Sequence, residues 1–194
     1  MRIVKNLFNQ AAAGLRVLLV MTVLLGVAYP LGVWAVSRIP GLQANAEGSV
    51  LTRDGQAVGS ALIGVDPVAA DPAADPWFHT RPSAAADAST SGGSNKSGFN
   101  EDLLAQVAER KAAIAGREGV DPSRVPPDAV TASASGLDPS ISVAYAELQI
   151  PRVARNTGVA PDRVAELVRE HTGGVIPGVN VLQLNLAVQQ VTGR

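Results

Sequence analysis

The stretch VLLVMTVLLGVAYPLGVWAV, from Val17 to Val36, decides how this chain of 194 residues is organised. It contains no charged residue. At about 1.5 Å per residue, a helix of this length covers the hydrocarbon core of a bilayer, which is roughly 30 Å thick. A core helix of a soluble domain would need a polar face, and this stretch has none. The sequence therefore predicts one transmembrane helix, over residues 15–37.

A cleaved signal peptide is the alternative interpretation, because Ala44-Asn45-Ala46 resembles a cleavage site. The apolar region of a signal peptide spans only about 7–15 residues, however, and the cleavage site follows closely. Here the apolar run is longer, and the small residues lie well beyond its end. These lengths favour an anchor that is not cleaved.

The charges beside the span predict its orientation, because flanks rich in Lys and Arg stay in the cytoplasm. Three basic residues and no acidic one precede the span: Arg2, Lys5 and Arg16. On the other side, Arg38 is offset by Glu47. We therefore expect residues 1–14 to form a short cytoplasmic N-terminus and residues 38–194 to form an extracytoplasmic domain. That domain holds 13 basic and 17 acidic residues, a net charge of −4.

The span also offers a possible packing face for another membrane helix. Ala28 and Gly32 are four residues apart, and small residues at this spacing let two helices approach closely in lipid. Pro30 lies between them and frees a backbone carbonyl that a neighbouring helix can satisfy. The alternative is that the small residues only reflect an alanine-rich composition.

The outer portion is long enough for one compact domain. Residues 49–65 read as a hairpin with its turn at Asp54-Gly55 and a second strand reaching Val65. Residues 83–98 are small and polar and predict a long loop. Three helices are expected after it. The first runs from Asn100 to Gly116, and the third runs from Pro161 to Gly173-Gly174. The second begins at Asp138, with Pro139 in its first turn, and bends or stops at Pro151.

The last segment alternates apolar and polar residues over 182–188, which predicts a strand, with a short helix from Asn180 as the alternative. Strands near both ends of the domain and helices between them predict an α+β fold. The whole chain is thus expected to be a single N-terminal transmembrane helix followed by one extracytoplasmic α+β domain.

Composition excludes several classes of function. The chain has no cysteine and two histidines, so it has neither a thiol nucleophile nor a Cys-ligated or His-rich metal site. Its net charge of −1 gives no reason to expect a nucleic-acid partner. No G-x-S-x-G or H-E-x-x-H motif is present. We expect His171 to cap a helix end, His79 to belong to a packed aromatic corner, and Arg81 to bond loop carbonyls.

The sharpest local motif is Ser91-Gly92-Gly93-Ser94-Asn95. Adjacent glycines allow unusual backbone angles, and amide groups that point inward can hold a phosphate. The spacing is not that of a P-loop. A turn with exposed hydroxyls is the alternative and the favoured interpretation.

Taken together, the segments resemble the C subunit of the bacterial Kdp potassium-transporting ATPase. Five stretches carry this resemblance, in the order of the family and behind the same single span. They are GSALIG (59–64), WFHTRPSA (77–84), SGGSN (91–95), VPPDAVTASASGLDPSISVAYAELQIPRV (125–153) and VNVLQLNLAV (179–188). The run TASASGLDPSIS together with QIPRVA is the most specific part.

The resemblance implies a non-catalytic subunit of a complex in the bacterial cell membrane that imports potassium at high affinity. Its partners would be a channel-like subunit, which selects and carries potassium, and a P-type subunit, which hydrolyses ATP. The C subunit would be needed for assembly and regulation. In an alternative description it is a catalytic chaperone that raises the ATP affinity of the hydrolytic subunit. For that role the resemblance points to Ser91 to Ser94 and to Gln149 as nucleotide-binding residues.

The two lines of reasoning conflict over ATP. The charge pattern places the SGG loop and Gln149 outside, across the bilayer from cytoplasmic ATP. We therefore expect these residues to be structural, with Gln149 satisfying backbone groups near Pro151. The leading hypothesis is an assembly and regulatory subunit whose outer domain lies beside the channel mouth. A nucleotide-binding chaperone comes second, and an anchored cell-envelope hydrolase third.

Overall fold

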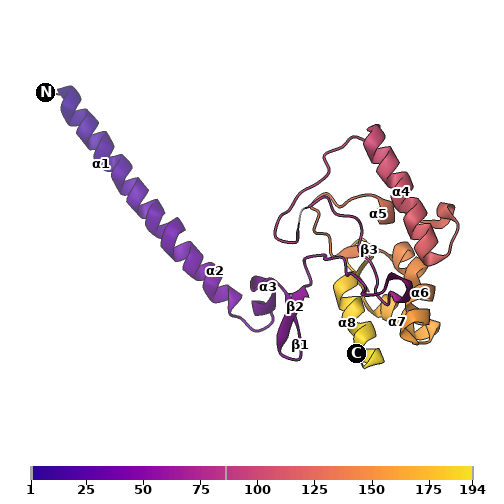
Figure 1. Ribbon diagram of the computed structural model, residues 1–194. Coiled ribbons are helices and arrows are strands. Elements are labelled where there is room, and N and C mark those ends of the chain that lie inside the picture. Colours follow the sequence, from indigo (N-terminus) through magenta and orange to yellow (C-terminus); the bar gives the residue numbers. More distant parts are fainter. Residues whose placement is uncertain (1, 86, 194) are drawn as a thin grey trace. The chain divides into compact units, whose positions relative to one another are not determined.

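The computed structural model describes residues 2–85 and 87–193. The chain divides into two compact units, Met1–Ser49 and Val50–Arg194. The first consists mainly of one long helix, and the second is a mixed domain of helices and small sheets (Figure 1). The expected fold class, one apolar N-terminal helix followed by an α+β domain, is confirmed.

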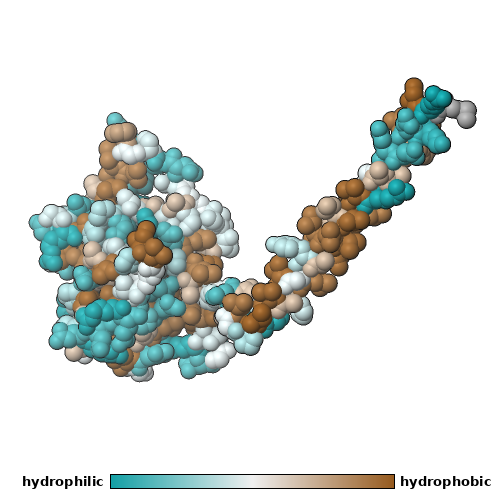
Figure 2. Space-filling model, turned by 180° about the vertical axis from the view of Figure 1, so that it is seen from behind, coloured by the Kyte–Doolittle hydropathy of each residue, from teal (hydrophilic) through white to brown (hydrophobic). Residues whose placement is uncertain are grey.

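Helical backbone runs from Arg2 to Ser37 through α1 (Arg2–Val23), η1 (Leu24–Ala28) and α2 (Tyr29–Ser37). These 36 residues include a window of mean hydropathy 2.2, and none of the window is buried. Figure 2 shows apolar side chains along most of the helix and polar ones at its amino end. The helix is long and apolar enough to cross a bilayer, and it continues on the amino side of the span predicted for residues 15–37.

The helix widens into a π-turn, η1, just before Pro30. There the amide of Tyr29 donates to the carbonyl of Leu24, five residues back. In a regular α-helix the ring of Pro30 would clash with the carbonyl of Gly26. A local π-turn is one of the ways in which a helix adapts to such a clash.

The end of this helix is held by local polar contacts. Arg38 forms an ion pair with Glu47 at 2.6 Å, beside the short helix α3 (Gln43–Ala46). The guanidinium of Arg38 also lies 5.7 Å from the ring centre of Trp34. Hydrogen bonds from Gln43 and Arg38 hold the pKa of Glu47 below its ordinary value. Arg38, the first basic residue after the span, is therefore paired, as its proximity to Glu47 in the sequence suggested.

The domain begins with the expected hairpin. Its antiparallel strands are β1 (Val50–Arg53) and β2 (Gln56–Ser60). Asp54 and Gly55 both have positive φ, 51° and 77°, the geometry of the tight turn that matches the twist of two strands. The predicted extension of the second strand to Val65 is wrong. Gly64 instead donates its amide to the carbonyl of Leu137, in a different part of the domain.

The rest of the domain consists of helices and short strands. In chain order they are η2 (Pro72–Ala74), α4 (Glu101–Glu118), η3 (Pro122–Arg124), α5 (Pro127–Val130), β3 (Ser140–Ser142), α6 (Val143–Thr157), α7 (Pro161–Glu170), β4 (Thr172–Gly173), β5 (Gly178–Asn180) and α8 (Val181–Thr192). The small sheet has the order β3-β5-β4, with antiparallel neighbours. Residues 83–98 form the expected loop without helix or strand among the residues described there.

The core lies between the helices and this small sheet. Helix α6 packs on α7 and on α4, and α7 packs on α8. Aliphatic side chains fill most of the core, with two fully buried aromatic ones, Phe78 and Tyr145. Val179 of β5 is fully buried and pairs with Ile141 of β3, so the sheet closes one side of the core.

Two expectations about the middle of the domain are wrong. No helix begins at Asp138 and Pro139, because Ser140–Ser142 pairs with β5 and the helix starts only after Ser142. The Ser142 hydroxyl accepts from the amide of Tyr145 and caps α6. Pro151 does not break this helix, which continues to Thr157 with Pro151 on its exposed face.

The predicted strand over 182–188 is also wrong, and the alternative, a helix that begins at Asn180, is confirmed. Asn180 caps α8 by accepting from the amide of Gln183 at 3.1 Å. The buried residues of α8 lie at helical spacing: Val181, Leu184, Asn185 and Val188. Two other predicted helix ends shift. Helix α4 runs past Gly116 to its cap at Gly119, and α7 ends at Glu170 instead of Gly173-Gly174.

Candidate functional site

The SGG loop lies along the backbone of residues 133–136. The Ser91 hydroxyl and the Gly92 amide both donate to the carbonyl of Ser135, at 2.9 and 2.7 Å. A side chain at Gly93 would come within 2.7 Å of the carbonyl oxygen of Ala134. This contact explains Gly93 as a place where two backbone segments approach closely, whereas a side chain at Gly92 would meet no atom within 4 Å. The Gly92 amide is occupied by its bond to Ser135, while Ser91 and Ser94 are exposed.

Gln149 lies elsewhere, on α6, and is fully buried. Its side-chain oxygen accepts from the amide of His79 at 2.8 Å, and its nitrogen donates to the carbonyl of His79 at 3.3 Å. The expectation that Gln149 serves backbone groups near Pro151 is therefore wrong. Its amide holds a segment that is 70 residues earlier in the sequence. The SGG loop and Gln149 have separate hydrogen-bonding partners.

Asn185 on α8 repeats this arrangement one residue earlier along the same segment. Its side-chain oxygen accepts from the amide of Phe78 at 2.8 Å, and its nitrogen donates to the carbonyl of Phe78 at 2.9 Å. Two helices thus each use one amide side chain to bind an extended backbone, much as a neighbouring strand would. We call Gln149 and Asn185 the amide clamps. Nothing local in the sequence marks them as a pair.

A network of buried charges surrounds the first clamp. Arg152 is 3% exposed and donates to Glu118, Asp75 and the Gln149 side chain. Glu118 in turn accepts from Arg117 at 2.7 Å. Because an isolated buried charge is very costly, this pairing is what allows the charges to be buried. Apart from Gln149, no local sequence pattern distinguishes the members of this network.

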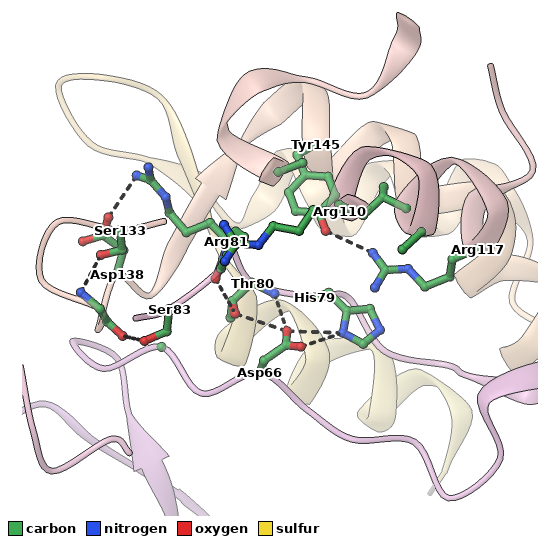
Figure 3. Close-up of a pocket in the computed structure, with 16 residues that line it drawn as sticks. Asp66, His79, Thr80, Arg81, Ser83, Arg110, Arg117, Ser133, Asp138 and Tyr145 are labelled. Carbon is green, nitrogen blue, oxygen red and sulfur yellow. Dashed lines mark hydrogen bonds and ion pairs between the residues drawn. The ribbon is translucent and has the colours of Figure 1, made fainter. Parts of the chain in front are cut away.

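His79 extends the network toward the surface (Figure 3). Its Nε2 lies 2.6 Å from Asp75, and its Nδ1 lies 3.2 Å from both carboxylate oxygens of Asp66. Each ring nitrogen of His79 thus faces a carboxylate. The ring therefore belongs to a polar network, and the expected aromatic corner is wrong for it.

Several pKa values reflect this network. Burial alone would raise the pKa of Asp75, but hydrogen bonds from His79 and the Trp77 amide, with the charge of Arg152, hold it below its ordinary value. Burial raises the pKa of the Tyr145 phenol. Burial would lower the pKa of Arg117, yet its contacts with Tyr145 and Glu118 raise it. The carboxylate of Asp75 and the guanidinium of Arg117 are thus both favoured in their charged forms by their neighbours.

Arg81 and His171 have the structural partners that were expected of them. Arg81 donates to the carbonyls of Thr131 and Ala132, as predicted, and also pairs with Asp138 at 3.0 Å. His171 follows the last turn of α7 and bonds the carbonyl of Leu167 at 2.8 Å, in agreement with a capping role. Within residues 2–85 and 87–193, no three His, Asp or Glu residues are grouped to hold a metal ion.

Ala28 and Gly32, the expected packing residues of the span, are not covered by any other part of the first unit. Ala28 ends the π-turn, and Gly32 follows in α2; both are exposed. A side chain added at Gly32 would meet no atom of the described chain within 4 Å. Their role as a contact for another helix stays a prediction.

Comparison with known proteins gives one consistent result. The family model described as KdpC: K+-transporting ATPase, c chain, matches residues 11–190. A Potassium-transporting ATPase KdpC subunit of Kineococcus radiotolerans is 48% identical over 193 residues, which cover 95% of each chain. The subunit of the same name from Mycobacterium tuberculosis is 45% identical over 194 residues, 94% of this chain and 99% of that one. That of Streptomyces avermitilis is 42% identical and covers 92% of both.

Proposed function

Because this chain belongs to the KdpC family, the c chains of K⁺-transporting ATPases, we propose that it is the non-catalytic accessory subunit of a potassium-importing ATPase complex. In this proposal the complex lies in the bacterial cell membrane. The N-terminal helix anchors the subunit beside a channel-like potassium-selective subunit and a P-type ATP-hydrolysing subunit. The outer domain supports their assembly and regulation from beside the channel mouth.

One observation carries the non-catalytic part of the proposal. Among the described residues, every buried side-chain nitrogen and oxygen already has a hydrogen-bond partner. A buried catalytic or nucleotide-binding group would need free donors or acceptors for its ligand. Gln149, the buried residue to which nucleotide binding was attributed, uses both its side-chain oxygen and its nitrogen in hydrogen bonds to His79 and Arg152. The alternative, a nucleotide-binding chaperone, would require the domain to open around it.

The charges along the chain are consistent with an extracytoplasmic position of the domain. Three basic residues precede the apolar span, whereas Arg38 behind it is paired with Glu47. The net charge of −4 on residues 38–194 would modestly raise the cation concentration near the channel mouth. Salt screens such a field within about 8 Å at physiological ionic strength, so the effect is local.

Cysteine labelling in intact cells tests this orientation. Because the natural chain has no cysteine, single-cysteine variants report one position each. We expect Val175→Cys, at a fully exposed position in the domain, to react with a membrane-impermeant maleimide in intact spheroplasts. Gln10→Cys, before the span, should react only after the membrane is permeabilised. The opposite pattern would refute both the orientation and the position beside the channel mouth.

A second test addresses the membrane helix. Gly32→Leu adds a bulky side chain where another helix is expected to approach closely, and should lower co-purification of the two large subunits. The matched control is Gly14→Leu, the same change at an open position nearer the amino end of the same helix. Recovery of the complex is measured by affinity purification from membranes. Undiminished recovery with Gly32→Leu would mean that the small residues reflect composition alone.

A further inference from the structure

A cleft of about 310 Å³ opens beside α4, between that helix and two segments of irregular backbone, residues 79–83 and 133–138 (Figure 3). Arg110 and Arg117 of α4 both line it. They are seven residues apart, which is two turns of a helix, so they lie on the same face. Ala113 and Ile114 lie between them and line the same cleft. A cleft of this size matches the small end of the range for ligand sites.

Most charged side chains in the cleft already have a polar or charged partner. Asp138 pairs with Arg81 at 3.0 Å, and Asp66 pairs with His79 at 3.2 Å. Arg117 pairs with Glu118 at 2.7 Å. Arg110 is different. Within the described parts of the chain it has no carboxylate within 4 Å, and its one hydrogen bond goes to the carbonyl of Val130 at 3.1 Å.

The two arginines of α4 keep donors free to meet a ligand. A guanidinium has five N–H groups in a fixed planar arrangement. Arg110 uses only Nη1, for the bond to Val130. Arg117 uses Nε for Glu118 and Nη2 for the Tyr145 hydroxyl, so its Nη1 has no partner among the described residues. Figure 3 shows both side chains directed into the cleft.

We propose that this cleft binds an oxyanion, a phosphate or carboxylate group of a small molecule, with Arg110 as its main ligand and Arg117 as a second. A half-buried guanidinium without a counter-charge attracts an anion, and its planar donors match the two oxygens of such a group. A cation is disfavoured, because both carboxylates in the cleft are already paired. The site is separate from the SGG loop, which does not line the cleft.

Calorimetric titration of the full chain in lipid nanodiscs tests the proposal, with sodium phosphate and sodium succinate as separate probes at constant ionic strength. We expect saturable binding of at least one anion. Arg110→Gln should weaken it roughly tenfold or more, since hydrogen bonds to charged groups are strong. Arg117→Gln should weaken it less. The matched control is Arg169→Gln, on the exposed face of α7, which should keep the affinity of the unchanged chain.

The two probes also identify the source of the anion. Binding of phosphate alone assigns the site to a phosphoryl group, and binding of succinate alone assigns it to a carboxylate. Melting temperatures without ligand show whether each variant is folded, and Arg110→Lys, which keeps the charge, should retain more affinity than Arg110→Gln. Absence of saturable binding of both anions, or equal affinity of folded Arg110→Gln and the unchanged chain, would overturn the proposal.

Discussion

Arg152→Met should lower the free energy of unfolding of the domain by about 3–5 kcal/mol, because it removes the buried guanidinium that Glu118 and Asp75 share and leaves them only Arg117 and His79 as side-chain partners. The Nε of Arg152 donates to both carboxylate oxygens of Glu118, at 3.1 and 3.0 Å. Its Nη1 donates to the carbonyl and the carboxylate of Asp75, at 2.9 and 3.0 Å. Methionine has a similar length and fills the space, so the loss measured is mainly that of the charge and its hydrogen bonds.

The neighbouring Arg155 provides the matched control for this substitution. It lies on the same helix, three residues later, but on the exposed face. Arg155→Met should change stability by no more than about 0.5 kcal/mol. Both are measured by urea unfolding of the full chain in nanodiscs, followed by Trp77 fluorescence in a Trp34→Phe background, since the chain has two tryptophans. Equal, small effects would show that the buried network contributes nothing to stability.

A double variant separates the charge from the packing. Adding Glu118→Gln to Arg152→Met removes one of the stranded carboxylates, so part of the lost stability should return. Arg117 would then lose its ion-pair partner but can turn toward solvent, because its side chain is 27% exposed. Simple addition of the two single losses would contradict the assigned pairing of Arg152 with Glu118.

Local signals in the sequence predicted local structure well. The uncharged run over residues 17–36 predicted the long apolar helix, and Asn100 predicted the start of α4, where it accepts from the amide of Leu103 at 3.0 Å. The turn at Asp54-Gly55 needed positive φ at two successive residues, which these residue types favour. Each feature depends on residues close together in the chain, so periodicity and capping rules were sufficient.

The wrong secondary-structure predictions concern segments whose structure is decided by contacts with residues distant in the sequence. Residues 140–142 are a strand because β5, some forty residues later, pairs with them. The leucines of α8 alternate with polar residues, yet Leu184, Asn185 and Val188 form one buried helical face. Asn185 is a polar residue on this apolar face because its side chain binds the backbone of Phe78. A polar residue on an apolar face was the only available signal of a clamp.

The candidate site could be predicted only in part for the same reason. The glycines of the SGG loop stand out as a motif, but the segment that they contact, Ala134 to Gly136, is about forty residues away. Arg110 gave no signal at all, because a single arginine on an amphipathic helix is an ordinary surface residue. Only the cleft beside it, and the absence of a carboxylate near it within the described chain, distinguish Arg110.

Gln149→Ala should lower the free energy of unfolding by about 2–4 kcal/mol while leaving the ATP response of the assembled complex unchanged. The substitution removes a fully buried side chain and leaves the amide and carbonyl of His79 without their partners. Each unsatisfied buried group costs about 1–3 kcal/mol, and the cavity adds to the loss. Recovery of the assembled complex should fall accordingly. ATPase activity, normalised to assembled complex, gives the ATP concentration for half-maximal rate.

The second amide clamp makes this experiment decisive, because Asn185→Ala removes an equivalent pair of hydrogen bonds at Phe78. No nucleotide role is attributed to Asn185, so it reports the effect of a lost clamp alone. If both clamps are structural, the two variants lose stability to a similar extent, and neither changes the half-maximal ATP concentration. A rise of severalfold with Gln149→Ala, but not with an equally destabilised Asn185→Ala, would assign Gln149 to nucleotide binding. That result would also require the domain to open or face the cytoplasm, since a ligand contact needs atoms within about 3 Å.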